Sequence, residues 1–214
     1  EFGADIVTHS TTKYMEGHAN IIGGAVIDSG NFDWEQNDKF PGLTQPDESY
    51  HGAVYTKDFG KAGYVTKIVA QLLRDYGSTP APQNSYYLNL GLETLHLRME
   101  RHNENAYKVA HWLRTQPKVK EVYYVGFPDH RDYAVTKKQT TGFGGMISFA
   151  VDSFETVKKI LKGVDMVMFA ESLGGTETLI TYPTTQTHED TPKHLKEELG
   201  ITDCFLRLSV GIEN

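Results

Sequence analysis

Apolar and polar positions in the first third of the chain predict two short strands, a loop and a helix. Residues 4–7 indicate one strand, and residues 21–28, IIGGAVID, indicate a second whose glycines allow a cofactor or another strand to come close. Residues 29–60 hold glycine and proline breakers without any period, so we expect an irregular loop there. Apolar positions at helical spacing predict a helix over residues 61–76, ended by Gly77.

The second part of the chain begins with the longest helical pattern, at about residues 84–115, which carries one continuous apolar stripe. Shorter strands and helices follow after Pro117. The expected strands cover 120–125, 144–151, 166–169 and 205–210, and the expected helices cover 152–162 and 191–200. This order of elements indicates a small α+β domain whose helices pack on one face of a sheet.

Polar residues at the starts of the two short helices predict how these helices are capped. Asp152 is placed to cap the first, with Glu155 closing a capping box on it. Thr191 is placed to cap the second, with Pro192 at its first position and Gly200 at its end.

Composition limits the class of protein. At 214 residues, 39% hydrophobic and 23% charged, the chain is ordinary globular material of one large or two small domains. The net charge of −7 argues against a general nucleic-acid binder, and no apolar run is long enough to cross a membrane. Cys204 is the single cysteine, which we interpret as a core residue in a protein of a reducing, cytoplasmic compartment without disulfides.

The glycine-rich loop from His9 to Gly24 carries the candidate chemistry. Lys13 follows a hydroxyl at the adjacent position, Thr12, and another three residues back, Ser10. A lysine amine can form a Schiff base with a carbonyl cofactor, and hydroxyls can donate hydrogen bonds to a phosphate. Pyridoxal 5'-phosphate (PLP) needs both groups. The spacing alone leaves open that Lys13 is an ordinary exposed loop lysine.

Histidines on the long helix offer no metal site. His96, His102 and His111 do not share the spacing of metal ligands, so we expect surface or packing roles for them and no metal in the protein.

Several motifs resemble one enzyme family. The loop HSTTKY-x-x-GH is similar to the lysine motif of the cystathionine γ-synthase family, the PLP-dependent enzymes of cysteine and methionine metabolism. The resemblance continues, in the family's order, over essentially the whole chain, through GLETLHLRMERHNENA (91–106), ESLGGTETLITYP (171–183), TH (187–188) and RLSVGIE (207–213). The long segment between Gly30 and Gly60 resembles the O-acetylhomoserine sulfhydrylase branch.

The resemblance implies an α/β fold, the C-terminal part of a fold-type I PLP-dependent transferase. Residues 1–83 would end the large PLP-binding domain, residues 84–116 would form a long linking helix, and residues 117–214 would form the small α+β domain. The family places a cofactor-ring aspartate, a stacking tyrosine and a phosphate loop before the lysine, so we expect a preceding half. It also borrows a tyrosine and an arginine from a neighbouring subunit, which implies a homo-oligomer, here a homotetramer built from dimers.

Residue roles follow from the same resemblance. Lys13 would hold the cofactor and then move protons, while Ser10 and Thr12 would bind its phosphate. Arg207 would bind the substrate α-carboxylate, with Ser172 at the same place. A guanidinium matches a carboxylate bidentately, although Arg207 taken alone could equally lie on a solvated strand face.

Two departures from the family pattern bear on substrate choice. Asn20 and Tyr182 replace residues that are more usual in relatives, and both could tune which substrate is accepted.

The implied reaction is a γ-replacement of O-acetyl-L-homoserine by sulfide or a thiol, giving homocysteine or methionine and acetate. Two alternatives stay open. One is a methionine or cystathionine γ-lyase, or a cystathionine γ-synthase, of the same family. The other is a non-catalytic half that serves assembly or regulation.

Overall fold

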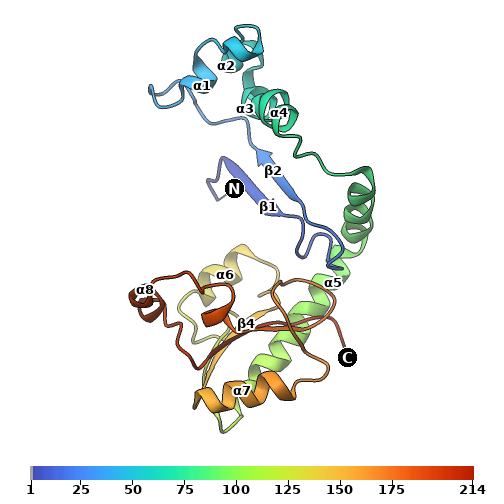
Figure 1. Ribbon diagram of the computed structural model, residues 1–214, viewed down its shortest axis with the longest axis vertical. Helices are drawn as coiled ribbons and strands as arrows, with labels where there is room; N and C mark the ends of the chain where they lie inside the picture. Colours follow the sequence, from blue (N-terminus) through green and yellow to red (C-terminus); the bar gives the residue numbers. More distant parts are fainter. Residues whose placement is uncertain (1) are drawn as a thin grey trace. The chain divides into compact units, whose positions relative to one another are not determined.

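The computed structural model describes residues 2–214 and divides into two compact units. The N-terminal unit comprises the residues up to Thr11 together with Ile22–Tyr86, and the C-terminal unit comprises Thr12–Ile21 and Tyr87–Asn214. Figure 1 colours the chain along its sequence. Within residues 2–214, no helix combines the length and apolar character that crossing a membrane requires. The expected domain limits at residues 83 and 116 stay a prediction.

The N-terminal unit contains both predicted strands, with shifted bounds. Strands β1 (Ile6–Ser10) and β2 (Gly24–Asp28) pair antiparallel, with Ile6 opposite Asp28 and Ser10 opposite Gly24. His9 and Ser10, expected in the loop, therefore end a strand. The pairing extends further because polar side chains in a two-stranded ribbon can face solvent, which the apolar pattern does not register.

The expected loop over residues 29–60 is partly helical. Three short helical turns form there: α1 (Pro41–Thr44), which begins with proline, η1 (Glu48–Tyr50), which Asp47 caps, and α2 (Tyr55–Asp58). The predicted helix over 61–76 is present as a series of consecutive segments. These are η2 (Gly60–Ala62), α3 (Gly63–Lys67), the π-helical η3 (Ile68–Leu73) and α4 (Arg74–Tyr76). Gly77 ends the series, as predicted, with a φ of 68°.

Aromatic side chains hold this segment together. Trp34 stacks on Tyr64 with ring centroids 5.3 Å apart and lies edge-on to Phe40. Phe32 contacts both Trp34 and Phe40. Such ring pairs contribute about 0.5–1.5 kcal/mol each beyond the area that they bury. The long connection is therefore fixed to the helical series by stacking.

Helix α5 (Pro82–Arg114) confirms the longest predicted helix. In the C-terminal unit, a five-stranded sheet has the order β3-β4-β7-β6-β5, antiparallel except for the β5–β6 pair. Its strands are β3 (Val119–Tyr123), β4 (Met146–Val151), β5 (Met168–Phe169), β6 (Leu179–Thr181) and β7 (Phe205–Ser209). The remaining helices are α6 (Tyr133–Gln139), α7 (Phe154–Gly163), η4 (Pro183–Thr185) and α8 (Lys193–Glu198).

One face of this sheet carries the hydrophobic core. Strand register places Ile147 opposite Leu208 and Phe149 opposite Leu206, so all four side chains point to the same side. They pack with buried residues of α5 and α7, among them Val157, which is fully buried. The two helices lie along the sheet in Figure 1. Cys204 packs against the same cluster, which agrees with its interpretation as a core residue.

Strand β6 and helix α6 were not predicted. Strand β6 is only three residues long and lies inside ETLITYP, a run too short to show a period. Helix α6 has no buried residue, so it lacks the apolar stripe from which a helix is recognised.

Both predicted helix caps are displaced by one residue. The cap of α7 is Ser153, whose hydroxyl accepts from the Thr156 amide at 3.3 Å, and Glu155 pairs with Lys158 instead of closing a capping box. Asp152 still contributes, because it accepts from the Thr156 hydroxyl at 2.5 Å.

The residue that caps α8 is Pro192, and no side-chain hydrogen bond caps the helix, so the expected role of Thr191 is wrong. The turn over Gln186–Asp190 precedes the helix, and the Thr191 amide donates back to the His188 carbonyl at 3.1 Å.

A core truncation tests the assignment of the packed face. Leu206 is fully buried at the centre of the sheet, so Leu206→Ala removes methyl groups that the surroundings cannot fully replace. We expect the free energy of unfolding in urea to fall by about 2–5 kcal/mol. The control Leu199→Ala, at a residue 64% exposed, should change it by about 0.5 kcal/mol or less. Equal effects would contradict the assignment.

Asp47 supplies a pH test of the N-terminal unit. Hydrogen bonds from Ser49, with Oγ to Oδ1 at 2.7 Å, and from Lys67, with Nζ to Oδ2 at 2.9 Å, lower the pKa of Asp47 from 3.8 to about 2. Since the folded pKa lies below the unfolded one, the carboxylate adds stability above pH 3.8 that is lost as the pH falls through about 2. Carboxyl ¹³C NMR should show Asp47 ionised at pH 3.8. Ser49→Ala and Lys67→Met should each raise its pKa, and Glu48→Gln should not.

Candidate active site

Lys13 lies at the start of a single tight turn. The Gly17 amide donates to the Lys13 carbonyl at 2.8 Å and closes the turn, and Gly17 has a φ of 77°, which favours glycine. We call residues 13–17 the lysine turn. Lys13 is partly buried, and its Nζ donates to the Ser172 hydroxyl at 3.1 Å. The structure therefore joins two residues that lie 159 positions apart and that the motifs singled out independently.

Ser172 lies in the connection between β5 and β6, and its backbone is strained. Its φ of 152° lies in a region that only glycine adopts freely. The connection is held at two points, since the Thr176 amide donates to the Gly17 carbonyl at 2.9 Å and the Gly174 amide donates to Ser209 Oγ at 2.8 Å. Residues in such conformations persist where their surroundings fix them, often at functional sites.

Arg207 reaches the same serine from β7. The register that turns Leu206 and Leu208 into the core places Arg207 on the other face, opposite Thr181 of β6. One guanidinium nitrogen, Nη2, donates to the Ser172 carbonyl at 3.4 Å and to Thr181 Oγ1 at 3.3 Å. Its Nε is buried without a hydrogen-bond partner in the described part of the chain. Burial lowers the pKa of Arg207, and Glu171 partly offsets this.

An unpaired buried donor on a guanidinium is costly unless an acceptor reaches it. The carboxylate of a bound molecule is the acceptor that matches this fork best. Ser172 therefore lies between an amine and a guanidinium, its hydroxyl on Lys13 and its carbonyl on Arg207.

Thr181 is a site residue that sequence reasoning missed. It is buried, its hydroxyl donates to the Ala170 carbonyl at 3.1 Å, and it accepts from Arg207. Only the pairing of β6 with β7 brings it beside Arg207, and a short strand gives no signal from which that pairing could be predicted.

The other predicted site residues lie as follows. Ser10 is exposed at the end of β1, and Thr12 is partly buried just before the lysine turn. Their predicted contact with a phosphate stays a prediction. Of the two departures from the family pattern, Asn20 is exposed, and its backbone N–H donates to Glu16 Oε2 at 3.2 Å. Tyr182 is buried, and its hydroxyl donates to the Asp203 carbonyl at 3.2 Å.

Within the described residues no group of histidine, cysteine and carboxylate side chains could hold a metal ion. His96 and His111 are exposed. His102 is fully buried, with Nδ1 2.6 Å from the Val210 carbonyl and its ring edge-on to Tyr14. These positions agree with the surface and packing roles expected for the three histidines.

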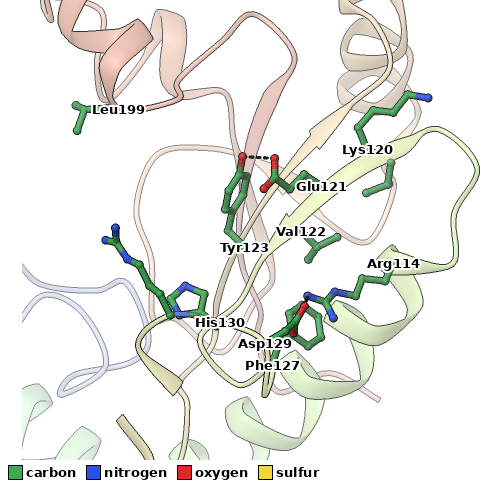
Figure 2. Close-up of a pocket in the computed structure, with 11 residues that line it drawn as sticks. Arg114, Lys120, Glu121, Val122, Tyr123, Phe127, Asp129, His130 and Leu199 are labelled. Atoms are coloured by element: carbon green, nitrogen blue, oxygen red, sulfur yellow. Dashed lines mark hydrogen bonds and ion pairs between the residues drawn. The ribbon is translucent and has the colours of Figure 1, made fainter. Parts of the chain in front are cut away.

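The C-terminal unit also contains a hollow of about 670 Å³ beside β3, drawn in Figure 2. Both of its carboxylates are already paired. Arg114 donates to both oxygens of Asp129, and the Tyr123 hydroxyl donates to Glu121 at 2.6 Å. None of the predicted site residues lines it, so its size does not make it the candidate active site.

Comparisons with known proteins agree with the geometry. The sequence pattern of the family described as "Cys/Met metabolism PLP-dependent enzyme" matches residues 1–214. The O-acetyl-L-homoserine sulfhydrylase of Leptospira meyeri is 39% identical over 223 residues, which are 99% of this chain and 50% of that protein. The cystathionine beta-lyase of Coxiella burnetii is 42% identical over 215 residues, which are 100% of this chain and 47% of that protein.

A solved structure gives the same result for the fold. It is described as a candidate O-acetylhomoserine (thiol)-lyase from Campylobacter jejuni with N'-pyridoxyl-lysine-5'-monophosphate, and it superimposes with a TM-score of 0.92. The sequences are 33% identical, and the match covers 99% of this chain and 51% of that one. The predicted α/β fold of a fold-type I PLP-dependent enzyme is therefore confirmed. The chain spans about half the length of the relatives that it matches, and it belongs to the Cys/Met metabolism family of PLP-dependent enzymes.

Proposed function

We propose that this chain is the lysine-bearing half of a PLP-dependent O-acetylhomoserine sulfhydrylase. The observation that carries the proposal is the link through Ser172 between the Lys13 amine and the Arg207 guanidinium. An amino-acid substrate needs a reactive amine near its Cα and a cation at its carboxylate. The whole reaction exchanges the acetate on Cγ of O-acetyl-L-homoserine for sulfide, giving L-homocysteine and acetate.

The residues present fit the cofactor. Lys13 offers a partly buried amine. Its Nζ donates to the neutral Ser172 hydroxyl, so this hydrogen bond does not tie the amine to a carboxylate. When bound, PLP supplies an aldehyde that such an amine can hold covalently, and a ring that withdraws electrons from the bonds at Cα. We assign Lys13 to this attachment, and we assign Ser10 and Thr12 to the phosphate, because each offers a hydroxyl donor close to Lys13 in sequence.

Lys13 also moves the proton in this proposal. A neutral amine within reach of Cα acts as a general base there, and it can later return the proton. The Ser172 hydroxyl, 3.1 Å from Nζ, orients the amine through a hydrogen bond. Because the hydroxyl is uncharged, it forms no ion pair with the amine. The strained backbone of Ser172 fixes the direction from which the hydroxyl approaches.

Arg207 orients the substrate. Its buried Nε and its Nη groups can take the two oxygens of the α-carboxylate as a bidentate pair. Thr181 holds the guanidinium plane through Oγ1, 3.3 Å from Nη2. Binding the carboxylate at Arg207 places Cα toward Lys13, because both side chains contact Ser172.

A second candidate function is β- or γ-elimination. The 42% identity to a cystathionine beta-lyase supports it, and the same lysine and arginine would serve it. Products separate the two reactions. Homocysteine from O-acetylhomoserine and sulfide supports replacement, whereas a keto acid and ammonia from cystathionine or methionine support elimination.

We further propose a homo-oligomer, a tetramer of the dimer-of-dimers type, in the cytoplasm. The single cysteine and the family's use of residues from a neighbouring subunit support this. The molecules that bind at the site are then a small amino-acid substrate and sulfide.

Lys13→Ala tests the attachment in the full-length protein. We expect turnover to fall by on the order of 10²- to 10⁴-fold, because the general base is lost. After borohydride treatment and denaturation, the wild type should keep the cofactor on the Lys13 peptide and the variant should keep none. The control Lys57→Ala, at an exposed lysine, should behave as the wild type. Covalent retention of cofactor in Lys13→Ala would contradict the assignment, and a wild type that binds no cofactor would indicate a non-catalytic protein.

Arg207→Lys tests the carboxylate site, because lysine keeps the charge and loses the fork. We expect kcat/KM to fall by roughly 30-fold or more, since loss of a buried charged hydrogen-bond pair costs about 2–5 kcal/mol. The control Arg131→Lys, at a side chain 90% exposed, should leave it unchanged. With the carboxamide analogue of the substrate, wild type and Arg207→Lys should react at similar rates. A persisting difference would show that Arg207 acts elsewhere.

A further inference from the structure

Arg98, on helix α5, carries a buried guanidinium directly against the lysine turn. The residue is 5% exposed, and burial lowers its pKa, with Glu16 partly offsetting this. Its nitrogens donate to the Tyr14 carbonyl at 2.8 Å, the Met15 carbonyl at 3.3 Å and the Gly91 carbonyl at 2.6 Å. No carboxylate forms an ion pair with the guanidinium in the described part of the chain. Backbone carbonyl oxygens accept the hydrogen bonds that water would accept from an exposed arginine.

The two turn carbonyls need this donor. A single turn leaves its last carbonyls without partners inside the turn, and the hydrogen bond that closes this turn uses Lys13 and Gly17. The next amide that could return to Tyr14 is that of His18, which donates to Glu16 Oε2 at 2.9 Å instead. A cation at the carbonyl end of a helical turn is also favoured by the turn's dipole.

Two glycines make room for this arrangement. A Cβ on Gly91 would lie 2.3 Å from the Glu16 carbonyl oxygen, so only glycine lets α5 touch the backbone of the turn. A Cβ on Gly17 would lie 2.1 Å from Arg98 Nη1. The overlap at Gly91 is with backbone, which cannot move away, whereas the overlap at Gly17 is with the end of the Arg98 side chain, which would be pushed off the turn. The contact between α5 and the lysine turn therefore depends on the guanidinium filling a space of fixed size.

The opposite side of the turn is equally restricted. The Tyr14 ring lies edge-on to the buried His102, with centroids 5.1 Å apart. A Cβ on Gly174 would lie 2.8 Å from the Tyr14 amide nitrogen. Packing thus holds the ring and the backbone N–H of Tyr14, whereas its carbonyl is held by one flexible side chain. That side chain is Arg98.

We propose that Arg98 is a positioning residue for Lys13: by binding the Tyr14 and Met15 carbonyls, it fixes the direction in which the preceding lysine projects its amine toward Ser172. Arg98 touches neither substrate nor cofactor in this arrangement. It acts through the two backbone carbonyls, and the Thr94 hydroxyl, 3.1 Å from Nε, holds its plane. The inference rests on one part of the proposed function, namely that Lys13 transfers the proton at Cα.

The test measures proton transfer at Cα separately from turnover. Full-length wild type, Arg98→Lys and Arg98→Met are loaded with PLP, and exchange of the Cα hydrogen of L-methionine in D₂O is followed by NMR. We expect both variants to lose on the order of 10- to 100-fold in exchange rate at saturating amino acid, because a displacement of about 1 Å at a reacting group has that effect. KM should change less than kcat, since the carboxylate site at Arg207 is untouched.

Control variants separate positioning from folding. Arg101→Met removes a half-exposed arginine of the same helix, whose ion pair is with Glu104 at 3.7 Å, and should leave exchange unchanged. Thr94→Val removes the Nε partner together with the 3.4 Å hydrogen bond of the Thr94 hydroxyl to the Gly91 carbonyl, and should give a smaller loss than Arg98→Lys. If Arg98→Met does not fold, Arg98→Lys and Thr94→Val still give the comparison. Thermal melts identify variants that lose activity by unfolding.

The outcomes distinguish the two proposals. Wild-type exchange rates in a folded Arg98→Lys and a folded Thr94→Val would overturn the positioning role while leaving the proposed function intact. Exchange in the wild type without homocysteine formation from O-acetylhomoserine and sulfide would contradict the proposed function, and slower exchange in Arg98→Lys would still support the positioning role.

Discussion

The alternation of side chains along β7 is the constraint on which the C-terminal unit depends. Leu206 and Leu208 enter the core, so Arg207 and Ser209 must face the other side. A shift of one residue would bury the guanidinium among apolar side chains and expose two leucines. Both changes raise the free energy of the folded state, so the register is strongly specified. The core therefore fixes which face presents Arg207, and through Thr181 and Ser172 it fixes where the guanidinium lies.

The parts of the fold that follow from periodic patterns could be predicted from the sequence. Helix α5 and strands β4 and β7 are long or regular enough to show their period, and Gly77 ends its helical series as expected. Elements whose stability comes from partners elsewhere could not be predicted. The short strand β6 and the exposed helix α6 belong to this group, as do the cap positions that differ by one residue.

The candidate site shows the same division. Motifs singled out Lys13, Ser172 and Arg207, and these three residues meet in the structure. Thr181 and Arg98 were not singled out, because each matters through a contact that only the fold creates. Thr181 depends on the β6–β7 register, and Arg98 depends on a glycine 7 residues before it that lets two backbones touch. A buried arginine on an otherwise ordinary helix gives no periodic signal.

The strained serine has a mechanical consequence. Ser172 contacts the amine through its side chain and the guanidinium through its main chain, so the two groups share one rigid support. A carboxylate arriving at Arg207 competes with the Ser172 carbonyl for the same nitrogen. Under the proposed function, a rotation of that peptide would move both contacts of Ser172, so an occupied carboxylate site would change the hydrogen bond to the amine. The carboxylate site and the amine of the proposed function are therefore linked through one residue, Ser172.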